Sequence, residues 1–185
     1  MSSRMGEWQP ATVEERLDRL ESIAELRQLV MRYAVHLYSR NLDPLCELFE
    51  PNVVVGQSKV GREAIKEWFN TIMRAMRTTI HHVENHMIDF QDAEHATGVV
   101  YCTDELERVA AGEWEIGVLQ YWDNYVRVDG RWYFSRRRLH RWYICDALTR
   151  PGHAVGVGSG ADPLKPRLLP DAYPSWALFW DTGDN

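Results

Sequence analysis

A change in the spacing of apolar residues near residue 78 is the feature that most constrains the fold. Before it, apolar side chains recur every three or four residues, as on helices that bury one face; after it, they alternate with polar ones, as in strands. The last of the turns in the alternating region, Asp129-Gly130, is a strong hairpin signal because both residues tolerate positive φ. Short turns between long strands predict an antiparallel meander. Its four predicted strands are residues 79–90, 96–108, 114–128 and 131–145.

The region before the strands predicts helices. Thr12 and Glu15 have the spacing of a capping box, in which each side chain satisfies a free backbone donor of the other residue. Helices followed by an antiparallel sheet indicate an α+β fold, in which the helices bury their apolar faces on one side of a curved sheet and leave a cone-shaped cavity. The predicted elements are a long helix over 12–39, a short helix over 45–49 with Asp43-Pro44 at its start, a brief strand at 53–55, and a third helix that opens at Gly61.

Composition excludes several classes of function. The chain has 185 residues, which favours one domain, and it contains no run of about 18 apolar residues that would span a membrane. A net charge of −6 argues against nucleic acid as a partner, and strand alternation would split the one basic cluster, Arg136–Arg138, between two faces. The N-terminus lacks the apolar core of a signal peptide, so we expect a cytoplasmic protein, and three scattered cysteines fit reduced thiols.

The chain divides into three parts by composition. Residues 1–11 are expected to be a disordered N-terminus, and residues 12–145 form the predicted α+β domain. Residues 146–185 are an extension rich in glycine and proline that ends in the aromatic segment 173–180. An aromatic segment of this kind is costly to leave in water, so we expect it to dock over the pocket or on a second subunit.

The stretch Thr79–His86 (TIHHVENH) holds three histidines within a predicted strand. Strict alternation would put His81, Val83 and Asn85 on one face, and it would put on the other the three residues His82, Glu84 and His86. A histidine on a concave inner face is a base suited to neutral pH. The second set is a poor metal site, because neighbours on one strand face lie about 6.8 Å apart while a zinc ligand lies at about 2 Å. We therefore expect no metal.

Five segments carry a resemblance to a known family: RYAVHLYSRNLDPLCELFEP, GREAIKEWF, TIHHVENH, ATGVVYCTDEL and YWDNYVRVDGRWYFSRR. Together the matching region covers roughly residues 15–145. It resembles the SnoaL-like members of the nuclear-transport-factor-2-like (cystatin-like) superfamily, and is most similar to their bile-acid 7α-dehydratase and scytalone dehydratase branches. The resemblance implies an α+β cone. The same fold also serves isomerases, cyclases and non-catalytic subunits, so fold alone does not imply activity.

The resemblance also implies site residues. His81 falls on the histidine that takes a proton in these dehydratases, Tyr33 on their helix tyrosine, Asp104 on their strand aspartate and Arg141 on their late-strand arginine. One position departs from the pattern, because Tyr38 stands where the family has a helix-end aspartate that orients the histidine. Either Asp104 takes over this role, or Tyr38 acts differently, or the elimination chemistry has been lost.

The leading hypothesis is a cofactor-free lyase, a dehydratase first and a double-bond isomerase second, acting on a hydrophobic cyclic small molecule. His81 would remove the proton, Tyr33 with Arg141 would hold the oxygen on which negative charge develops, and Asp104 would orient His81 or assist the leaving hydroxyl. The residues expected to contact the substrate are Tyr38, Trp68, Asn85, Tyr101 and Trp122.

Two alternatives belong to other classes of function. One is a binding protein that carries a ligand without converting it, which the Tyr38 replacement favours. The other is a scaffold subunit similar to the β subunit of ring-hydroxylating dioxygenases. Whichever function applies, we expect the chain to form a homodimer or homotrimer.

Overall fold

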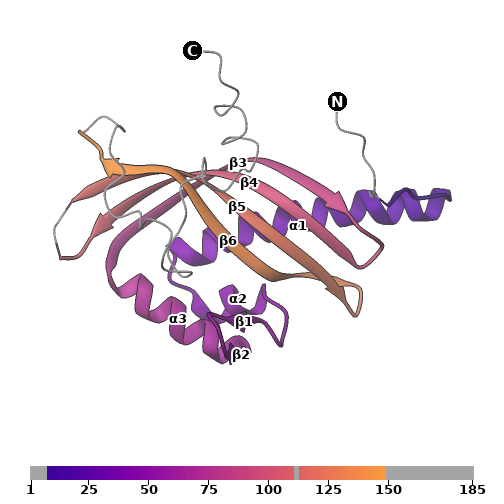
Figure 1. Cartoon of the computed structure of the whole chain (residues 1–185), viewed down its shortest axis with the longest axis horizontal. Coiled ribbons are helices and arrows are strands. Elements are labelled where there is room, and N and C mark those ends of the chain that lie inside the picture. Colours follow the sequence, from indigo (N-terminus) through magenta and orange to yellow (C-terminus); the bar gives the residue numbers. More distant parts are fainter. Residues whose placement is uncertain (1–7, 111–112, 149–185) are drawn as a thin grey trace, which may run out of the picture.

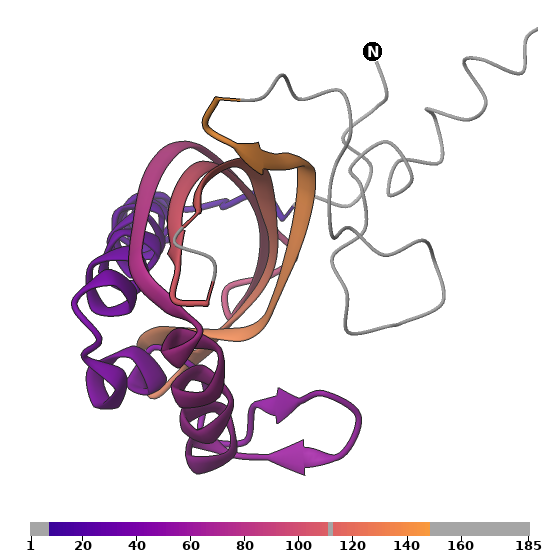
Figure 2. The same ribbon diagram turned by 90° about the vertical axis from the view of Figure 1, so that its left-hand side faces the viewer.

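Helices lie against one face of a strongly curved four-stranded sheet, as the sequence predicts (Figures 1 and 2). The structure is a computed structural model that describes residues 8–110 and 113–148. Strands β3 to β6 are antiparallel and adjacent in chain order, so the predicted α+β meander is confirmed. The elements are α1 (Val13–Tyr38), α2 (Leu42–Glu47), β1 (Val54–Val55), β2 (Lys59–Val60), α3 (Arg62–Arg74), β3 (Met76–Phe90), β4 (His95–Arg108), β5 (Trp114–Val128) and β6 (Arg131–Asp146).

Helix α1 begins at the predicted capping box. The backbone N–H of Glu15 donates to Thr12 Oγ1 at 3.1 Å, and the backbone N–H of Thr12 donates to Glu15 Oε2 at 3.1 Å. From Leu26 to Leu37 the apolar face of α1 is buried in the core. Leu17 and Leu20 are exposed, because the first turns of α1 extend past the end of the sheet (Figure 1).

Helix α2 starts earlier than the sequence suggests. Its N-cap is Asn41, so the proline predicted at the first position is the third helical residue. The first N–H groups of a helix have no intrahelical partner, and Pro44 therefore costs no hydrogen bond there. After α2 the chain pairs with β6, since the N–H of Phe134 donates to the carbonyl of Leu48 at 2.9 Å. Helix α3 begins after Gly61, as predicted, with φ of 99° at that glycine.

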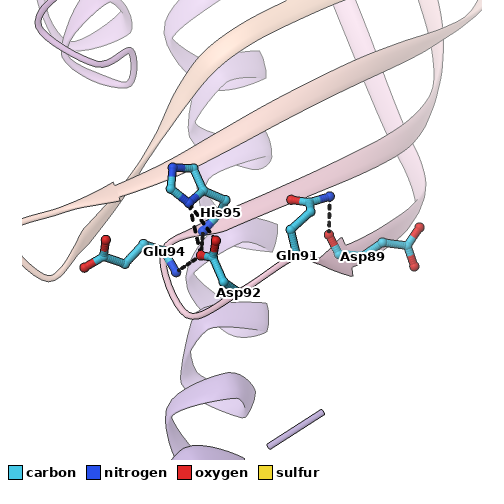
Figure 3. Close-up of polar contacts among 5 residues, drawn as sticks. All are labelled: Asp89, Gln91, Asp92, Glu94 and His95. Atoms are coloured by element: carbon cyan, nitrogen blue, oxygen red, sulfur yellow. Dashed lines mark hydrogen bonds and ion pairs between the residues drawn. The ribbon is translucent and has the colours of Figure 1, made fainter. Parts of the chain in front are cut away.

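The turns between the strands have specific chemistry. Asp129 and Gly130 both have positive φ, of 50° and 77°, which confirms the predicted hairpin between β5 and β6. In the turn between β3 and β4, Asp92 Oδ1 accepts hydrogen bonds from the backbone N–H groups of Glu94 and His95 at 2.7 and 2.8 Å (Figure 3). The ring Nδ1 of His95 lies 3.0 Å from the same oxygen, so one carboxylate organises this turn.

A β-bulge interrupts β3 in the middle of the histidine stretch. Val83 pairs with Cys102 and His86 pairs with Val100, so two residues of β3 stand opposite one residue of β4. The predicted alternation through His86 is therefore wrong beyond Val83. His86 shares the inner face with His81, and Asn85 is exposed.

Arg40 fastens the end of α1 to the start of β3. Its Nη1 donates to Thr79 Oγ1 at 2.6 Å and its Nη2 donates to the carbonyl of Met76 at 3.0 Å. Burial lowers the pKa of Arg40. These bonds fix β3 two residues before His81, and so they position that histidine against the helix layer.

Residues 1–7 and 149–185 lie outside the described residues, as do most of the predicted N-terminal segment and extension. The expectation of disorder to residue 11 does not hold for Trp8, whose N–H donates to the carbonyl of Phe90 at 2.9 Å. Cys46 and Cys102 are buried thiols that form no disulfide among the described residues. Within residues 8–110 and 113–148, no helix is long and apolar enough to cross a membrane.

Candidate active site

The inner face of the sheet, which meets the helices, carries two groups of buried polar side chains among aromatic rings. The first cluster consists of His81, Asp104 and Arg141, from β3, β4 and β6. The second cluster consists of His86, Asp123, Tyr125 and Arg137. The rings of Tyr33 and Tyr121 lie between them, since Tyr121 contacts both His81 and Arg137.

The first cluster contains a buried ion pair between Asp104 and Arg141. Arg141 donates through Nη1 and Nη2 to the two oxygens of Asp104, at 2.9 and 2.8 Å, and Asp104 is 1% exposed. Gly117 on β5 makes room for this pair, because a Cβ at that position would overlap both Asp104 Oδ1 and Arg141 Nη1. The bidentate geometry is the strongest that arginine and carboxylate form.

His81 lies opposite Asp104 in the pairing of β3 with β4. Its ring stacks on Tyr121 with centroids 6.5 Å apart, and its Nδ1 is buried with no hydrogen-bond partner among the described residues. Burial lowers the pKa of His81 to about 4; the nearby carboxylate of Asp104 opposes this, and Arg137 and Arg141 reinforce it. The imidazole is therefore neutral at pH 7 and offers a lone pair, and its lowered pKa makes it a weaker base than an exposed histidine.

Asp104 was expected to orient His81, and Arg141 to hold a substrate oxygen, but in the structure the two side chains bind each other. The two carboxylate oxygens of Asp104 accept hydrogen bonds from Arg141, and neither accepts one from His81 Nδ1. Arg141, in turn, donates from both Nη1 and Nη2 to that carboxylate. The two residues thus neutralise each other, and the guanidinium is not a free anchor for an anion.

Arg137 is the centre of the second cluster. It donates through Nε and Nη2 to the two oxygens of Asp123, at 2.8 and 2.7 Å, and both side chains are almost fully buried. Burial works against its charge, but Asp123 holds the pKa of Arg137 above its usual value. Its guanidinium carbon lies 4.2 Å from the ring centroids of Tyr33, Tyr121 and Phe134, an aromatic cage for a cation. Arg137 Nη1 is buried and has no hydrogen-bond partner among the described residues.

Tyr33 enters the site from α1. It is buried, and burial raises its pKa to about 12, which the charge of Arg137 only partly offsets. The phenol therefore keeps its proton at neutral pH and can donate a hydrogen bond. Both Tyr33 and His81 contact Tyr121, so the helix tyrosine and the strand histidine lie around the same ring.

A chain of hydrogen bonds extends from Arg137 to His86. The hydroxyl of Tyr125 donates to Asp123 Oδ2 at 2.8 Å, and His86 Nε2 lies 3.0 Å from the Tyr125 oxygen. Gly98 on β4 permits this approach, since a Cβ there would lie 2.9 Å from His86 Nε2 and 2.8 Å from Tyr125 Cε2. Burial lowers the pKa of His86 to about 4.

The five residues predicted to contact a substrate do not line this inner face. Tyr38 and Trp68 are 45% and 48% exposed, and Asn85 is exposed because of the bulge. Tyr101 and Trp122 point to the outer face, because their strand neighbours Cys102 and Tyr121 point inward. The structure therefore does not bring these five side chains together with His81, and their contact with a substrate stays a prediction.

The bulge also separates the residues considered as metal ligands. His82 lies 3.4 Å from Glu105, and Glu84 accepts a hydrogen bond from Thr103 at 2.8 Å, both on the outer face, whereas His86 points inward. Among the described residues, no group of three or more histidine, cysteine, aspartate or glutamate side chains is arranged to hold a metal ion.

Sequence reasoning missed most of the second cluster. Alternation does place Arg137 on the face opposite Arg136 and Arg138, and both of these are exposed. Counting back from the Asp129-Gly130 turn, however, would pair Asp123 with Arg136. A register shift between Asn124 and Tyr125 pairs Asp123 with Arg137 instead, so no sequence signal indicated this ion pair.

Comparison with known proteins assigns the sequence to a domain family. The sequence profile of the SnoaL-like domain matches residues 18–138. A scytalone dehydratase-like protein from Novosphingobium aromaticivorans has a similar structure, with TM-score 0.62, 26% identity, and coverage of 80% of this chain and 99% of that one. No protein with a curated description matches the sequence.

Two further solved structures share the fold at lower identity. The hexachlorocyclohexane dehydrochlorinase LinA-type3 from Novosphingobium barchaimii has TM-score 0.66 and 21% identity, over 73% of this chain and 96% of that one. An aromatic ring hydroxylase-like protein from Novosphingobium aromaticivorans has TM-score 0.60 and 18% identity, over 75% of this chain and 97% of that one.

Proposed function

Because the chain belongs to the SnoaL-like domain family, we propose that it is a cofactor-free lyase in which His81 is the general base. The observation that carries this proposal is the His81 imidazole itself, which is neutral, buried on the inner face and has an Nδ1 without a partner among the described residues. Similarity to a scytalone dehydratase-like protein over nearly all of that protein's length supports an elimination reaction. The substrate class is a hydrophobic cyclic molecule with a hydroxyl and a carbonyl group.

The reaction begins with a proton next to the carbonyl group. His81 takes this proton, the C–H electron pair forms an enolate, and negative charge develops on the oxygen. The enolate then expels the hydroxyl group, which leaves as water after taking a proton from the imidazolium. Return of the proton to a different carbon, without expulsion, would give double-bond isomerisation.

The developing negative charge requires hydrogen-bond donors. Tyr33 keeps its proton because burial raises its pKa to about 12, and Arg137 Nη1 is a buried donor without a hydrogen-bond partner among the described residues. Arg137 lies against the rings of Tyr33 and Tyr121, and Tyr121 stacks on His81. Arg141, in contrast, is engaged with Asp104. We therefore assign the oxygen-binding role to Tyr33 with Arg137. One donor of this type is worth about 3 kcal/mol of transition-state stabilisation.

The test compares two histidines of the same strand. Purified protein is incubated with scytalone and, separately, with hexachlorocyclohexane, and the loss of water or chloride is followed by mass spectrometry and chloride release. We expect turnover of at least one probe by the wild type and a loss of about 10²-fold or more in His81→Asn. The matched control, His82→Asn, changes an exposed histidine on the outer face and should keep full activity. Equal rates for wild type and His81→Asn would rule out the assigned base.

A binding protein is the second candidate, and the position of Tyr38 favours it. Tyr38 occupies the family's aspartate position but is 45% exposed, and no described carboxylate accepts a hydrogen bond from His81 Nδ1. If titration calorimetry shows that these cyclic compounds bind but neither is converted, the inner face serves as a carrier site.

A further inference from the structure

The hydrogen bonds around Tyr125 define which nitrogen of His86 carries its proton. Asp123 receives two hydrogen bonds from Arg137, so its carboxylate is ionised and acts only as an acceptor. Tyr125 has one hydroxyl proton and donates it to Asp123. In its contact with His86, the Tyr125 oxygen can therefore only accept a hydrogen bond. His86 Nε2, 3.0 Å away, is the donor.

The other ring nitrogen of His86 is consequently an acceptor. In a neutral imidazole with a proton on Nε2, Nδ1 has a lone pair. This Nδ1 is buried and has no hydrogen-bond partner among the described residues. An unsatisfied buried polar atom destabilises a fold, and a structure tolerates it where a bound group supplies the missing bond.

Two features of the backbone bring His86 to this position. The bulge in β3 turns it inward, where strict alternation would have turned it outward. Gly98 then leaves the space that the contact between His86 and Tyr125 needs. A bulge and a close-contact glycine at the same side chain are typical of a site where backbone geometry re-aims a functional group.

We propose that His86 Nδ1 accepts a hydrogen bond from a hydroxyl group of a bound ring compound, and so forms a subsite distinct from His81. The ligand class is an uncharged alcohol or phenol. A hydroxyl is required because Nδ1 needs a donor, and a carboxylate is disfavoured because Asp123 already neutralises Arg137. This inference takes from the proposed function only that the inner face binds a small molecule, and not that it converts one.

The first test measures the preference for a hydroxyl group. Dissociation constants for 2-naphthol and naphthalene, which differ by one hydroxyl oxygen, are measured by titration calorimetry in wild type, His86→Phe and Tyr125→Phe. We expect the preference for 2-naphthol to fall about tenfold in His86→Phe, the size of one buried hydrogen bond. Tyr125→Phe should show a smaller loss, because the imidazole remains but its tautomer is no longer fixed. An unchanged preference in His86→Phe would overturn the proposal.

The second test needs no substitution that alters folding. Protein labelled with ¹⁵N-histidine is observed by NMR at neutral pH, where the Nδ1 signal of His86 should be that of an unprotonated nitrogen. We expect 2-naphthol to shift this signal in the direction of a newly accepted hydrogen bond, and naphthalene to leave it unchanged. A signal that is already hydrogen-bonded in the free protein and does not respond to 2-naphthol would show that water satisfies Nδ1, and would overturn the proposal.

These outcomes separate the subsite from the proposed lyase activity. His81→Asn should lower turnover about 10²-fold or more while keeping the preference for 2-naphthol over naphthalene. If no probe is converted but His86→Phe still loses the preference, the lyase proposal fails and the subsite stands. If His81→Asn loses turnover and His86→Phe keeps the preference, the subsite fails and the lyase proposal stands.

Discussion

Replacing Gly117 by alanine should disrupt the Asp104–Arg141 ion pair without straining the backbone. The new methyl group would occupy the space of Asp104 Oδ1 and Arg141 Nη1, so the pair must move apart. Gly117 does not have a positive φ, and alanine therefore adopts its backbone conformation freely. Overpacking a core costs about 1–3 kcal/mol, and removing one partner of a buried pair costs about 3–5 kcal/mol. Because the pair is displaced and not lost, we expect a decrease of about 3 kcal/mol in the free energy of unfolding.

Urea unfolding followed by tryptophan fluorescence measures this loss. Gly56→Ala is the control, since nothing lies within 4 Å of a Cβ there and only its φ of 65° is unfavourable; its cost should be about 1 kcal/mol. The same Gly117→Ala change is then made in an Asp104→Ala/Arg141→Ala background, where the methyl group has room and should cost less than about 0.5 kcal/mol. An equal cost in both backgrounds would refute the argument that Gly117 exists to accommodate the ion pair.

Two further predictions concern charge. The folded-state pKa values of His81 and His86, about 4, lie below the ordinary value of 6.5, so the unfolded chain binds more protons between these values. The contribution of these residues to the free energy of unfolding is fully present above pH 6.5 and is lost as the pH falls to about 4. Between pH 7.5 and pH 5.0, urea unfolding should therefore show a decrease on the order of 1–2 kcal/mol per histidine, and a His81→Phe/His86→Phe variant should lack this decrease. Asp123→Asn should lower the free energy of unfolding by about 3–5 kcal/mol, because it leaves Arg137 buried and unpaired. Asp18→Asn breaks the more exposed ion pair with Arg127 and should cost at most about 1 kcal/mol. Equal costs for these two variants in the same urea assay would contradict this reasoning.

The sequence predicted the architecture because each element has a local signal. The period change near residue 78, the capping box at Thr12 and the Asp129-Gly130 turn each depend on a few neighbouring residues, and all three agree with the structure. The resemblance also identified His81 and Tyr33, which the structure brings to the same ring. These predictions needed no knowledge of strand register.

The remaining features depend on register, which the sequence does not specify. The bulge after Val83 reverses the faces of Asn85 and His86, and the shift before Tyr125 determines which arginine meets Asp123. A bulge inserts a single residue and has no distinctive composition, so alternation from a fixed starting point fails beyond it. Tyr101 and Trp122 were misplaced for a different reason, because their aromatic character was taken as a sign of a pocket although strand parity puts them on the outer face.

The bulge in β3 changes the local twist of the strand and leaves its inward side chains in phase. Deleting Asn85 would leave Glu84 alone opposite Tyr101, and strict alternation would then keep His81 and His86 on the same face. The ladder with β4 would become regular, and no core side chain of β3 would move into solvent. Because a bulge bends its strand and increases the twist, this one outward-facing insertion adds to the curvature of the sheet.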